Sequence, residues 1–530
     1  MPRPDRTKVR AHLVGGGIAS LAAAAFLIRD GDLLGRNITI YEELAQVGGS
    51  LDGSGDAERG YLMRGGRMIE SKYLCTYDLL SSIPALDGRR TVTQEIFDWN
   101  QVLRTDSKSR FVREGRRVDA PEFGLAERHI LALEKLVLEP EAMLGRTRIE
   151  EHFGASFFRT NFWLMWCTTF AFQPWHSAVE LKRYLLRFAH MVDGFNELRG
   201  IMRTVYNQYD SMVLPLRRWL EARGVQFSLG TQVSDIGFAR IDGRSLAASI
   251  AFDRPGLHGR VSVEPTDLVI ATLGSMTEGS SIGDMETPPR LNGKRAGGAW
   301  RLWERLAQGR PELGRPGAFC DHVGGSKWVS FTTTLDDGEF FRRVCELTGN
   351  VPGEGGLITF TESNWLMSIV LPHQPHFIGQ PADVQVFWGY GLFVDRPGNF
   401  VARPMAECNG RELMTEVLGH LGIDEGGPSI LAHANCRPCM MPFITSQFMP
   451  RANGDRPLVR PPGYDNFAVV GQFCEQPADV VFTVEYSVRS AMSAVYSLLE
   501  LDRKVPPVFK GQLRPRNVYR AFRALHDLPA

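Results

Sequence analysis

Short apolar runs that end in glycine or acidic residues recur along this chain and predict the strands of one parallel sheet. Two of them, residues 11–14 and 38–41, lie near the N-terminus, and three more, residues 225–229, 267–275 and 466–472, lie far downstream. The continuous apolar character of the fourth run is typical of a strand covered on both faces. Since the runs come from three separate parts of the chain, the predicted domain is discontinuous in sequence.

Two helical patterns accompany these runs. An apolar, alanine-rich segment, residues 21–28, follows the first run, and a segment of alanines, serines and valines, residues 481–501, follows the last. Thr483 and Ser487 fall one turn apart on one face at the start of this second helix.

A glycine turn joins the first run to the first helix. The segment VGGGIAS, residues 14–20, gives the order strand, turn, helix, which lets backbone N–H groups approach a pyrophosphate. Such turns also occur without a ligand, so the motif alone leaves an ordinary turn open. Ser20 stands where the pattern has its third glycine, and a small residue still allows close packing of helix on strand.

The residues after the second run indicate which dinucleotide the turn would hold. Glu42 and Glu43 end that run, and an acidic residue there suits a ribose diol and repels the ribose phosphate of NADP. Diglycines at 48–49 and 65–66 follow. Paired turns of this kind suit a ligand larger than NAD that runs deep into the protein, so we predict FAD.

The segments between the sheet runs predict a substrate domain. They are rich in Trp, Phe and Met, which fits an ordinary core and also a long apolar cavity. The predicted fold class is α/β: a discontinuous Rossmann-like FAD-binding domain of the glutathione-reductase type, an inserted mixed α+β substrate domain and a C-terminal helical tail. The FAD-binding domain takes residues 1–100, 216–300 and 456–501, the substrate domain 101–215 and 301–455, and the tail 502–530.

Composition narrows the function classes. The chain of 530 residues is too long for one ordinary core, and its 60 basic and 60 acidic residues cancel, which gives no support for binding nucleic acid. No apolar stretch is long enough to span a bilayer, and the polar residues 2–10 lack the pattern of a signal peptide. Scattered cysteines, with Cys436 and Cys439 as the only close pair, favour reduced thiols in a cytoplasmic protein over a zinc site, and we expect no metal.

The segment 503–526 is basic and places Val518, Phe522 and Leu525 on one face of a short helix. One interpretation is a solvated end segment docked on the body. The other is a weak, peripheral contact with an anionic membrane surface.

Several stretches together resemble one family, the FAD-dependent oleate (fatty acid) hydratases, once called myosin-cross-reactive antigens. The matching stretches cover nearly the whole chain and lie at 15–31, 41–53, 64–75, 162–188, 206–216, 273–281, 362–369, 373–377, 440–451 and 471–491. Among them, GSMTEGSS and DVVFTVEYSVRSA have no generic folding reason, so the resemblance is specific.

The resemblance implies hydration of the cis-9 double bond of oleate-like unsaturated fatty acids to 10-hydroxy acids, with FAD required and no net redox change. Tyr184 matches the family's proton-donating tyrosine, whereas Gln208 and His376 match residues near the substrate carboxylate. For FAD, the glycine turns and the resemblance together predict contacts at Gly15, Gly17, Ala19, Ser20, Glu42 or Glu43, Ser50, Gly65, Gly66, Arg67, Met68, Val233, Ser275, Gly471, Gln472, Thr483 and Ser487.

The chain departs from the family at three positions. Met68 stands where the family has a glutamate that activates water, and Glu70 is the nearest acid in sequence. Val370 and Pro372 stand where many relatives carry polar carboxylate contacts. Relatives often have longer ends that contribute to dimers. In this chain the arm before the first apolar run is short and the C-terminal end is compact, so we expect a monomer.

Two other function classes stay open on the sequence. One is a flavin-dependent fatty acid oxidoreductase or isomerase, which the paired diglycines fit equally well. The other is a non-catalytic binder of flavin and lipid, which Met68 favours.

Overall fold

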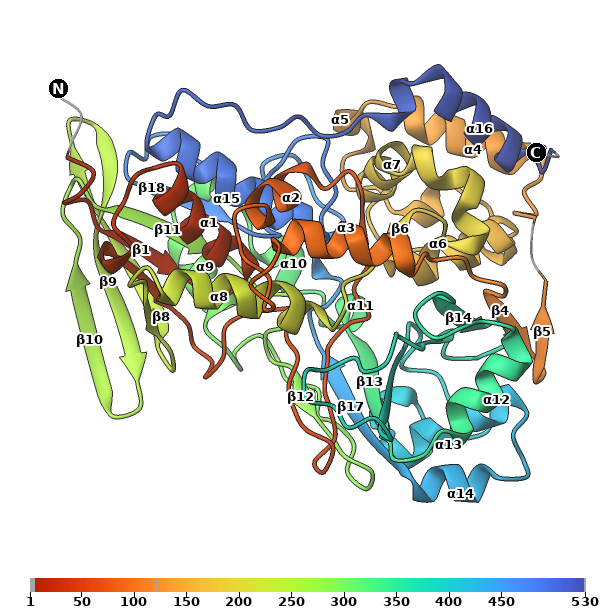
Figure 1. The fold of residues 1–530 in the computed structure, drawn as a ribbon. Helices are drawn as coiled ribbons and strands as arrows, with labels where there is room; N and C mark the ends of the chain where they lie inside the picture. The colour runs from red at the N-terminus through yellow and green to blue at the C-terminus, as the bar shows by residue number, and fades with distance from the viewer. Residues whose placement is uncertain (1–4, 120–121, 529–530) are drawn as a thin grey trace.

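The computed structural model describes residues 5–119 and 122–528. A five-stranded parallel sheet has the order β18-β11-β1-β2-β7, so each of the five predicted runs contains a strand. The strands are β1 (Ala11–Val14), β2 (Ile38–Tyr41), β7 (Gln226–Ser228), β11 (Leu268–Thr272) and β18 (Phe467–Val470). The two predicted helices are α1 (Ile18–Arg29) and α15 (Val484–Leu498), which pack on each other beside this sheet (Figure 1).

Smaller elements surround the parallel sheet. An antiparallel ribbon of three strands extends from it at the left edge of Figure 1. Its strands are β8 (Gln232–Ile241), β9 (Arg244–Arg254) and β10 (Leu257–Ser262). The helices of this half are α2 (Leu74–Leu80), α3 (Val92–Val102), α8 (Leu214–Glu221), α9 (Ala299–Ala307), α10 (Gly317–Cys320) and α11 (Val323–Ser326).

The other half is built on an eight-stranded sheet of order β12-β17-β13-β16-β15-β14-β4-β5, antiparallel except for the pair β14 and β4. Its strands are β4 (Phe111–Arg113), β5 (Arg116–Val118), β12 (Ser281–Ile282), β13 (Trp328–Leu335), β14 (Leu357–Phe360), β15 (Met367–Val370), β16 (Gln385–Gly391) and β17 (Ala434–Met441). A small two-stranded sheet pairs β3 (Ile69–Glu70) with β6 (Ile201–Met202).

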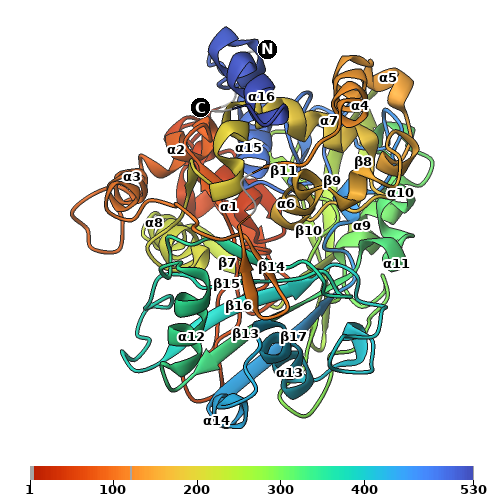
Figure 2. The same ribbon diagram turned by 90° about the vertical axis from the view of Figure 1, so that its right-hand side faces the viewer.

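Helices lie on both sides of the eight-stranded sheet. Figure 2 shows α12 (Glu339–Thr348), α13 (Gly410–Leu421) and α14 (Gly427–Ala432) below it. Above it lie α4 (Glu127–Leu138), α5 (Glu141–Leu144), α6 (Asn161–Phe170) and α7 (Ala178–Arg187). The predicted fold class, a discontinuous nucleotide-binding domain with an inserted α+β domain, matches this arrangement.

The five-stranded sheet and the eight-stranded sheet each have their own cluster of buried apolar side chains. The clusters do not follow the predicted domain limits in every place. Trp303 and Phe319, from the segment 301–455, pack in the cluster of the parallel sheet, whereas β12, from the segment 216–300, joins the eight-stranded sheet. The domain limits therefore stay a prediction.

The tail ends in helix α16 (Pro515–Leu525), which packs on the 3-10 segment η4 (Ala189–Glu197). Ala521, Ala524 and Leu525 face the core, whereas Val518 and Phe522 are 51% and 49% exposed. The predicted helix is present and docked on the body. Across the described parts of the chain, no helix combines the length and the apolar character that crossing a membrane requires.

Candidate active site

The largest cavity opens at the carboxyl edge of the parallel sheet and holds about 370 Å³. Its floor is the predicted glycine turn. Gly15 has φ +91°, in the left-handed region that favours glycine, and an added Cβ would lie 3.2 Å from the Cβ of Thr272. Gly17 caps α1 without a side-chain hydrogen bond, so the first N–H groups of this helix are available to a ligand phosphate. The backbone here fits a dinucleotide pyrophosphate.

The structure brings most of the predicted FAD contacts together in this cavity. They are Gly15, Gly17, Ala19, Glu42, Glu43, Ser50, Val233, Ser275, Gly471, Gln472 and Ser487. Ser20 differs, because it is fully buried and its hydroxyl lies 3.3 Å from the hydroxyl of Thr272. It contributes to the packing of α1 on β11, as its small size predicts.

Three carboxylates surround one end of the cavity. Glu42 accepts hydrogen bonds from the backbone N–H groups of Gly16 and Leu44 at 2.6 and 2.8 Å, and burial raises its pKa. Glu43 accepts from the Gln232 amide at 2.6 Å. Glu278, which the sequence analysis did not single out, is buried strongly enough to raise its pKa to about 8. At neutral pH Glu278 is therefore mostly protonated, and the predicted exclusion of NADP rests on Glu42 and Glu43.

A second, smaller space adjoins this cavity, and it holds the remaining predicted residues. Two pockets of about 100 and 40 Å³ share Gly65, Gly66 and Arg67 as lining, and we call them the apolar end and the polar end of one substrate chamber. Met68 and Thr483 line the apolar end. Gln472 connects the two spaces, because its amide donates to the Thr483 carbonyl at 3.0 Å and to the Ser487 hydroxyl at 2.8 Å.

The second diglycine is required by close packing. A Cβ at Gly66 would lie 2.9 Å from the ring of Trp388, and one at Gly65 would lie 2.7 Å from the guanidinium carbon of Arg67. Arg67 itself lies over the ring of Phe482 at 5.7 Å, and burial lowers its pKa to about 10. A larger residue at Gly66 would therefore have to displace an aromatic ring, whereas one at Gly65 would only have to move the end of the Arg67 side chain.

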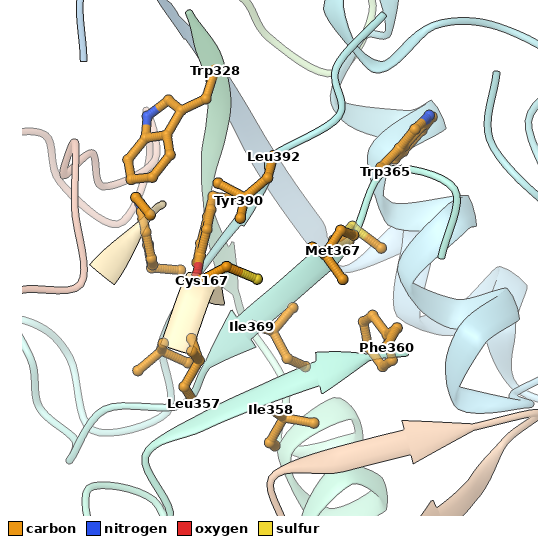
Figure 3. Packing of buried hydrophobic residues seen from close by; sticks show 14 of the residues in the cluster. Cys167, Trp328, Leu357, Ile358, Phe360, Trp365, Met367, Ile369, Tyr390 and Leu392 are labelled. Atoms are coloured by element: carbon orange, nitrogen blue, oxygen red, sulfur yellow. The ribbon is translucent and has the colours of Figure 1, made fainter. Parts of the chain in front are cut away.

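Aromatic side chains from both halves enclose the apolar end. Figure 3 shows Trp328 and Tyr390 side by side, with ring centroids 4.9 Å apart, and Leu357 near them. Tyr184 on α7 is 1% exposed, and its ring contacts Phe170 edge-on at 5.0 Å. Its hydroxyl donates to the carbonyl of Val481, and burial raises its pKa well above the ordinary value. A phenol in such a dry site is a weak acid unless the site stabilises its anion.

A buried ion cluster supports α7 one turn before Tyr184. Glu180 pairs with Arg451 at 2.8 Å and with Arg456 at 3.0 Å, and all three side chains are buried. Burial alone would raise the pKa of Glu180, but the two arginines outweigh it and lower the pKa to about 2. Arg183 lies three residues after Glu180 on the same helix. It pairs with Glu475, which lies in the loop after β18, at 2.9 Å. The cluster thus ties the tyrosine helix to the nucleotide-binding half.

Glu70 does not replace the missing glutamate at Met68. One of its carboxylate oxygens pairs with Arg187 at 2.7 Å, and the other accepts from the backbone of Lys72 at 2.7 Å. Burial would raise the pKa of Glu70, but His190 and Arg187 outweigh burial and lower it. A carboxylate held in this way is a weak base, although it lines the apolar end beside Met68.

The polar end contains Gln208 and His376, as the resemblance implies, and also Arg203. Burial, with a contribution from the charge of Arg203, lowers the pKa of His376 to about 3, so the ring is neutral. It can offer a hydrogen bond to a carboxylate but no charge. Val370 and Pro372 also line this end and add no polar group through their side chains.

All eight cysteines are free, and Cys436 and Cys439 are buried on β17. Among the described residues, one group, Glu304, Cys320 and Asp321, has the spacing to hold a metal ion. Lys294 lies 2.6 Å from both of its carboxylates and offsets one of their two negative charges.

A parallel nucleotide-binding sheet with an inserted substrate domain and a glycine-lined cavity defines a flavoprotein-type fold. Two solved structures share it: an oxidoreductase from Methanosarcina mazei, with a TM-score of 0.51 and 14% identity, covers 92% of this chain and 99% of its own. Cyclohexylamine oxidase from Brevibacterium oxydans IH-35A, with a TM-score of 0.50 and 11% identity, covers 93% and 99%. At these identities the likeness shows the fold alone.

The sequence comparisons are more specific. The model of the MCRA family matches residues 8–496, and the chain belongs to this family. It is 40% identical to an oleate hydratase of Streptococcus pyogenes serotype M49 over 98% of this chain and 90% of that protein. It is 32% identical to a linoleate hydratase of Lactiplantibacillus plantarum over 92% and 93%. The predicted resemblance is confirmed.

Proposed function

We propose that this protein is a hydro-lyase that binds FAD and adds water to a double bond of a long-chain unsaturated fatty acid. The observation that carries the proposal is a buried tyrosine hydroxyl, Tyr184, in an aromatic chamber that adjoins a dinucleotide cavity. The names of the two hydratase relatives support the same reaction class. For an oleate-like acid, the product would be the 10-hydroxy acid formed at the cis-9 double bond.

The chamber suits this reaction because its two ends differ. The polar end offers hydrogen-bond donors for a carboxylate, and the apolar end excludes water from an alkyl chain. An isolated alkene is not polarised, so the proton donor and the water must both be held within contact distance of it. Tyr184 would turn its hydroxyl from the Val481 carbonyl to the alkene carbon and give up its proton there. Water would attack the other alkene carbon, and the proton that this water loses would return to the tyrosinate.

The water must be oriented without a carboxylate at position 68. Met68 accepts no proton, and Glu70 is bound to Arg187, so neutral groups such as the hydroxyl of Thr169 and the backbone carbonyls of the apolar end remain. FAD, when bound, would supply electrostatic stabilisation without net electron transfer. This arrangement predicts a slower enzyme than one with an acid at position 68.

The test is mass spectrometry of products after incubation of the FAD-loaded protein with oleate in oxygen-18 water. A labelled hydroxy acid heavier than oleate by one water supports hydration. A product changed by two hydrogens would instead make the protein an oxidoreductase. Bound FAD and fatty acid with unchanged oleate would favour the non-catalytic binder.

We further propose that the protein is a cytoplasmic monomer that touches anionic membranes through α16. The support is the pair of half-exposed side chains Val518 and Phe522 next to a row of arginines. Light scattering tests the monomer. Cosedimentation with phosphatidylglycerol vesicles, compared between the native chain and Phe522→Ser, tests the membrane contact, which equal binding by the two would refute.

A further inference from the structure

Arg203 is a partly buried cation that lacks an anionic partner among the residues that the structure describes. It lies just after β6, and burial alone lowers the pKa of its guanidinium to about 10, with no carboxylate acting against this effect. Several other arginines of this protein that are removed from solvent are paired with a carboxylate. Arg64, for example, contacts Asp52 at 2.7 Å, and Arg187 contacts Glu70 at 2.7 Å. A charge in a site of low dielectric is costly to leave uncompensated.

The comparison with two similar arginines shows that Arg203 differs from a structural residue. Arg110 and Arg67 also have a pKa lowered by burial to about 10. The guanidinium of Arg110, however, donates to the carbonyls of Leu357 and Phe195 and to the hydroxyl of Thr169, at 2.8 to 3.3 Å. Arg67 donates to the carbonyl of Ser50 at 2.9 Å. The buried Nε of Arg67 has no acceptor, but its Nη2 has one. Within the described residues, Arg203 makes hydrogen bonds through its backbone alone, and its side chain, with a buried Nε, makes none.

The groups that share the polar end with Arg203 are also unsatisfied. The amide nitrogen of Gln208 and the Nδ1 atom of His376 are buried without a hydrogen-bond partner in the described part of the chain. The three side chains line one pocket of the chamber. A guanidinium, an amide N–H and a neutral imidazole N–H, none of which hydrogen-bonds to another group among the described residues, fit a small anion with two oxygens. The one carboxylate that lines the same pocket, Asp52, is paired with Arg64 at 2.7 Å.

We infer that Arg203 is the counter-cation of the substrate carboxylate and makes this protein select ionised fatty acids over neutral lipids of equal chain length. The inference rests on the proposed function, because the chamber must receive a fatty acid. It adds a charged residue to the contacts that the sequence predicted. Val370 and Pro372 give this end no polar side chain, so the guanidinium carries most of the recognition.

The position of Arg203 also bears on which carbon reacts. Gly65, Gly66 and Arg67 line the chamber between the polar end and the apolar end that holds Tyr184. A carboxylate fixed at Arg203 therefore sets how far along the chain the tyrosine hydroxyl meets the acyl group. Loss of the anchor would lower both affinity and the fraction of correctly placed alkene.

The experiment measures the binding of oleate and of oleyl alcohol to the FAD-loaded protein by titration calorimetry at pH 8. We expect the native protein to prefer oleate. Arg203→Gln should weaken oleate binding by about 10-fold or more and leave oleyl alcohol unchanged, because only the acid carries a charge. Arg260→Gln removes one positive charge from the exposed strand β10 and serves as the matched control, with no expected change.

Thermal unfolding without lipid separates this role from a structural one. Removal of an uncompensated buried charge should leave Tm unchanged or raise it, whereas loss of a structural arginine would lower it. Arg203→Lys keeps the charge without the planar fork, so it should retain part of the preference for oleate, and it provides the test if Arg203→Gln does not fold.

The possible failures are distinguishable. If the native protein hydrates oleate and Arg203→Gln still prefers oleate as strongly, the inference about Arg203 is wrong and the proposed function stands. If the native protein binds neither lipid, both are wrong. A selective loss of oleate binding in Arg203→Gln, with Arg260→Gln unaffected, establishes the anchor.

Discussion

The cofactor cavity and the substrate chamber share a boundary at the Gln472 amide but are built in different ways. Backbone turns at the carboxyl edge of the parallel sheet form much of the cavity, and many of the side chains along it are small or acidic, although Tyr41, Arg64 and Phe473 also line it. The chamber is formed by bulky side chains from α6, α7, β13, β16 and the loop before α15. One of its charged groups, Glu70, is buried and held by a long-range ion pair with Arg187.

This difference separates what each site depends on. A site made of backbone depends on the conformations that a few glycines permit, and most side-chain changes around it are tolerated. A site made of packed side chains depends on each of them, because a buried charge or hydroxyl that loses its partner is costly. We therefore expect single substitutions in the chamber to have larger effects than those in the cavity.

The largest effect on the rate of hydration should follow Tyr184→Phe, which removes one hydroxyl group from the chamber. Tyr184→Phe keeps the ring and its contacts with Phe170, so folding and FAD binding should persist. Loss of a general acid lowers the rate by about 10²- to 10⁴-fold, and the rate of hydroxy acid formation measures it.

Tyr390→Phe is the matched control for that substitution. Tyr390 lines the same end, but its hydroxyl donates to the carbonyl of Thr168, away from the assigned proton transfer. We expect a smaller loss of rate. Equal activity of Tyr184→Phe and the native protein would discard the proton-donor assignment and weaken the contrast between the two sites.

The next effect concerns stability. Glu180→Gln leaves Arg451 and Arg456 without their shared carboxylate, and removal of one partner from a buried ion pair costs about 3–5 kcal/mol. Chemical denaturation at pH 7 measures the free energy of unfolding. A loss below 1 kcal/mol would show that the chamber tolerates substitution as well as the cavity does.

The same carboxylate predicts a pH dependence. The pKa of Glu180 is about 2 in the folded protein, against an ordinary value of 4.5. Because the folded pKa is the lower one, the contribution of this group is fully present above pH 4.5 and is lost as the pH falls toward 2. Between pH 4.5 and about 2, the native protein should lose this contribution to its free energy of unfolding, whereas Glu180→Gln should lack the contribution at every pH.

The sequence predicted the backbone-built part well. β2 has the bounds of its apolar run, and α1 and α15 occur where their patterns lie, because strand, glycine turn and helix are consecutive in the chain. Local order sufficed, since the cavity is assembled at one edge of one sheet. Glu278 was missed, although an acid just after β11 was a usable signal.

The chamber was predicted less completely, for a physical reason. Gly66, Trp388 and Phe482 line one space but lie far apart in the sequence, and only the pairing of β13 and β16 and the placement of α15 bring them together. Tyr184, Gln208 and His376 were found through the family resemblance. Arg203 was not found, because an arginine becomes distinctive only when its missing partner is seen.

A gain of function would sharpen the contrast. Met68→Glu places a carboxylate on the apolar end, beside the chamber where water would attack. A base of this kind should raise the rate of hydration by about 10-fold. Activity assays at pH 6 to 8 measure it. Met63→Glu, on the polar end, is the matched control and should not raise the rate. A fall in activity with Met68→Glu would show that the chamber cannot accommodate another acid.

The smallest effect should come from the cavity. Gly15 has φ +91°, so Gly15→Ala strains the backbone by about 1 kcal/mol, which corresponds to about fivefold weaker FAD binding if the turn opens to relieve it. Gly17 has φ −74°, and a Cβ there would meet backbone no closer than 3.9 Å, so Gly17→Ala should not affect stability. Its methyl group would still stand at the start of α1, where the phosphates approach.

We therefore expect Gly15→Ala to lower both Tm and FAD affinity, and Gly17→Ala to lower FAD affinity alone, as measured by flavin fluorescence and thermal unfolding. A stability loss for Gly17→Ala as large as that for Gly15→Ala would mean that side-chain packing, and not backbone conformation, shapes the cavity.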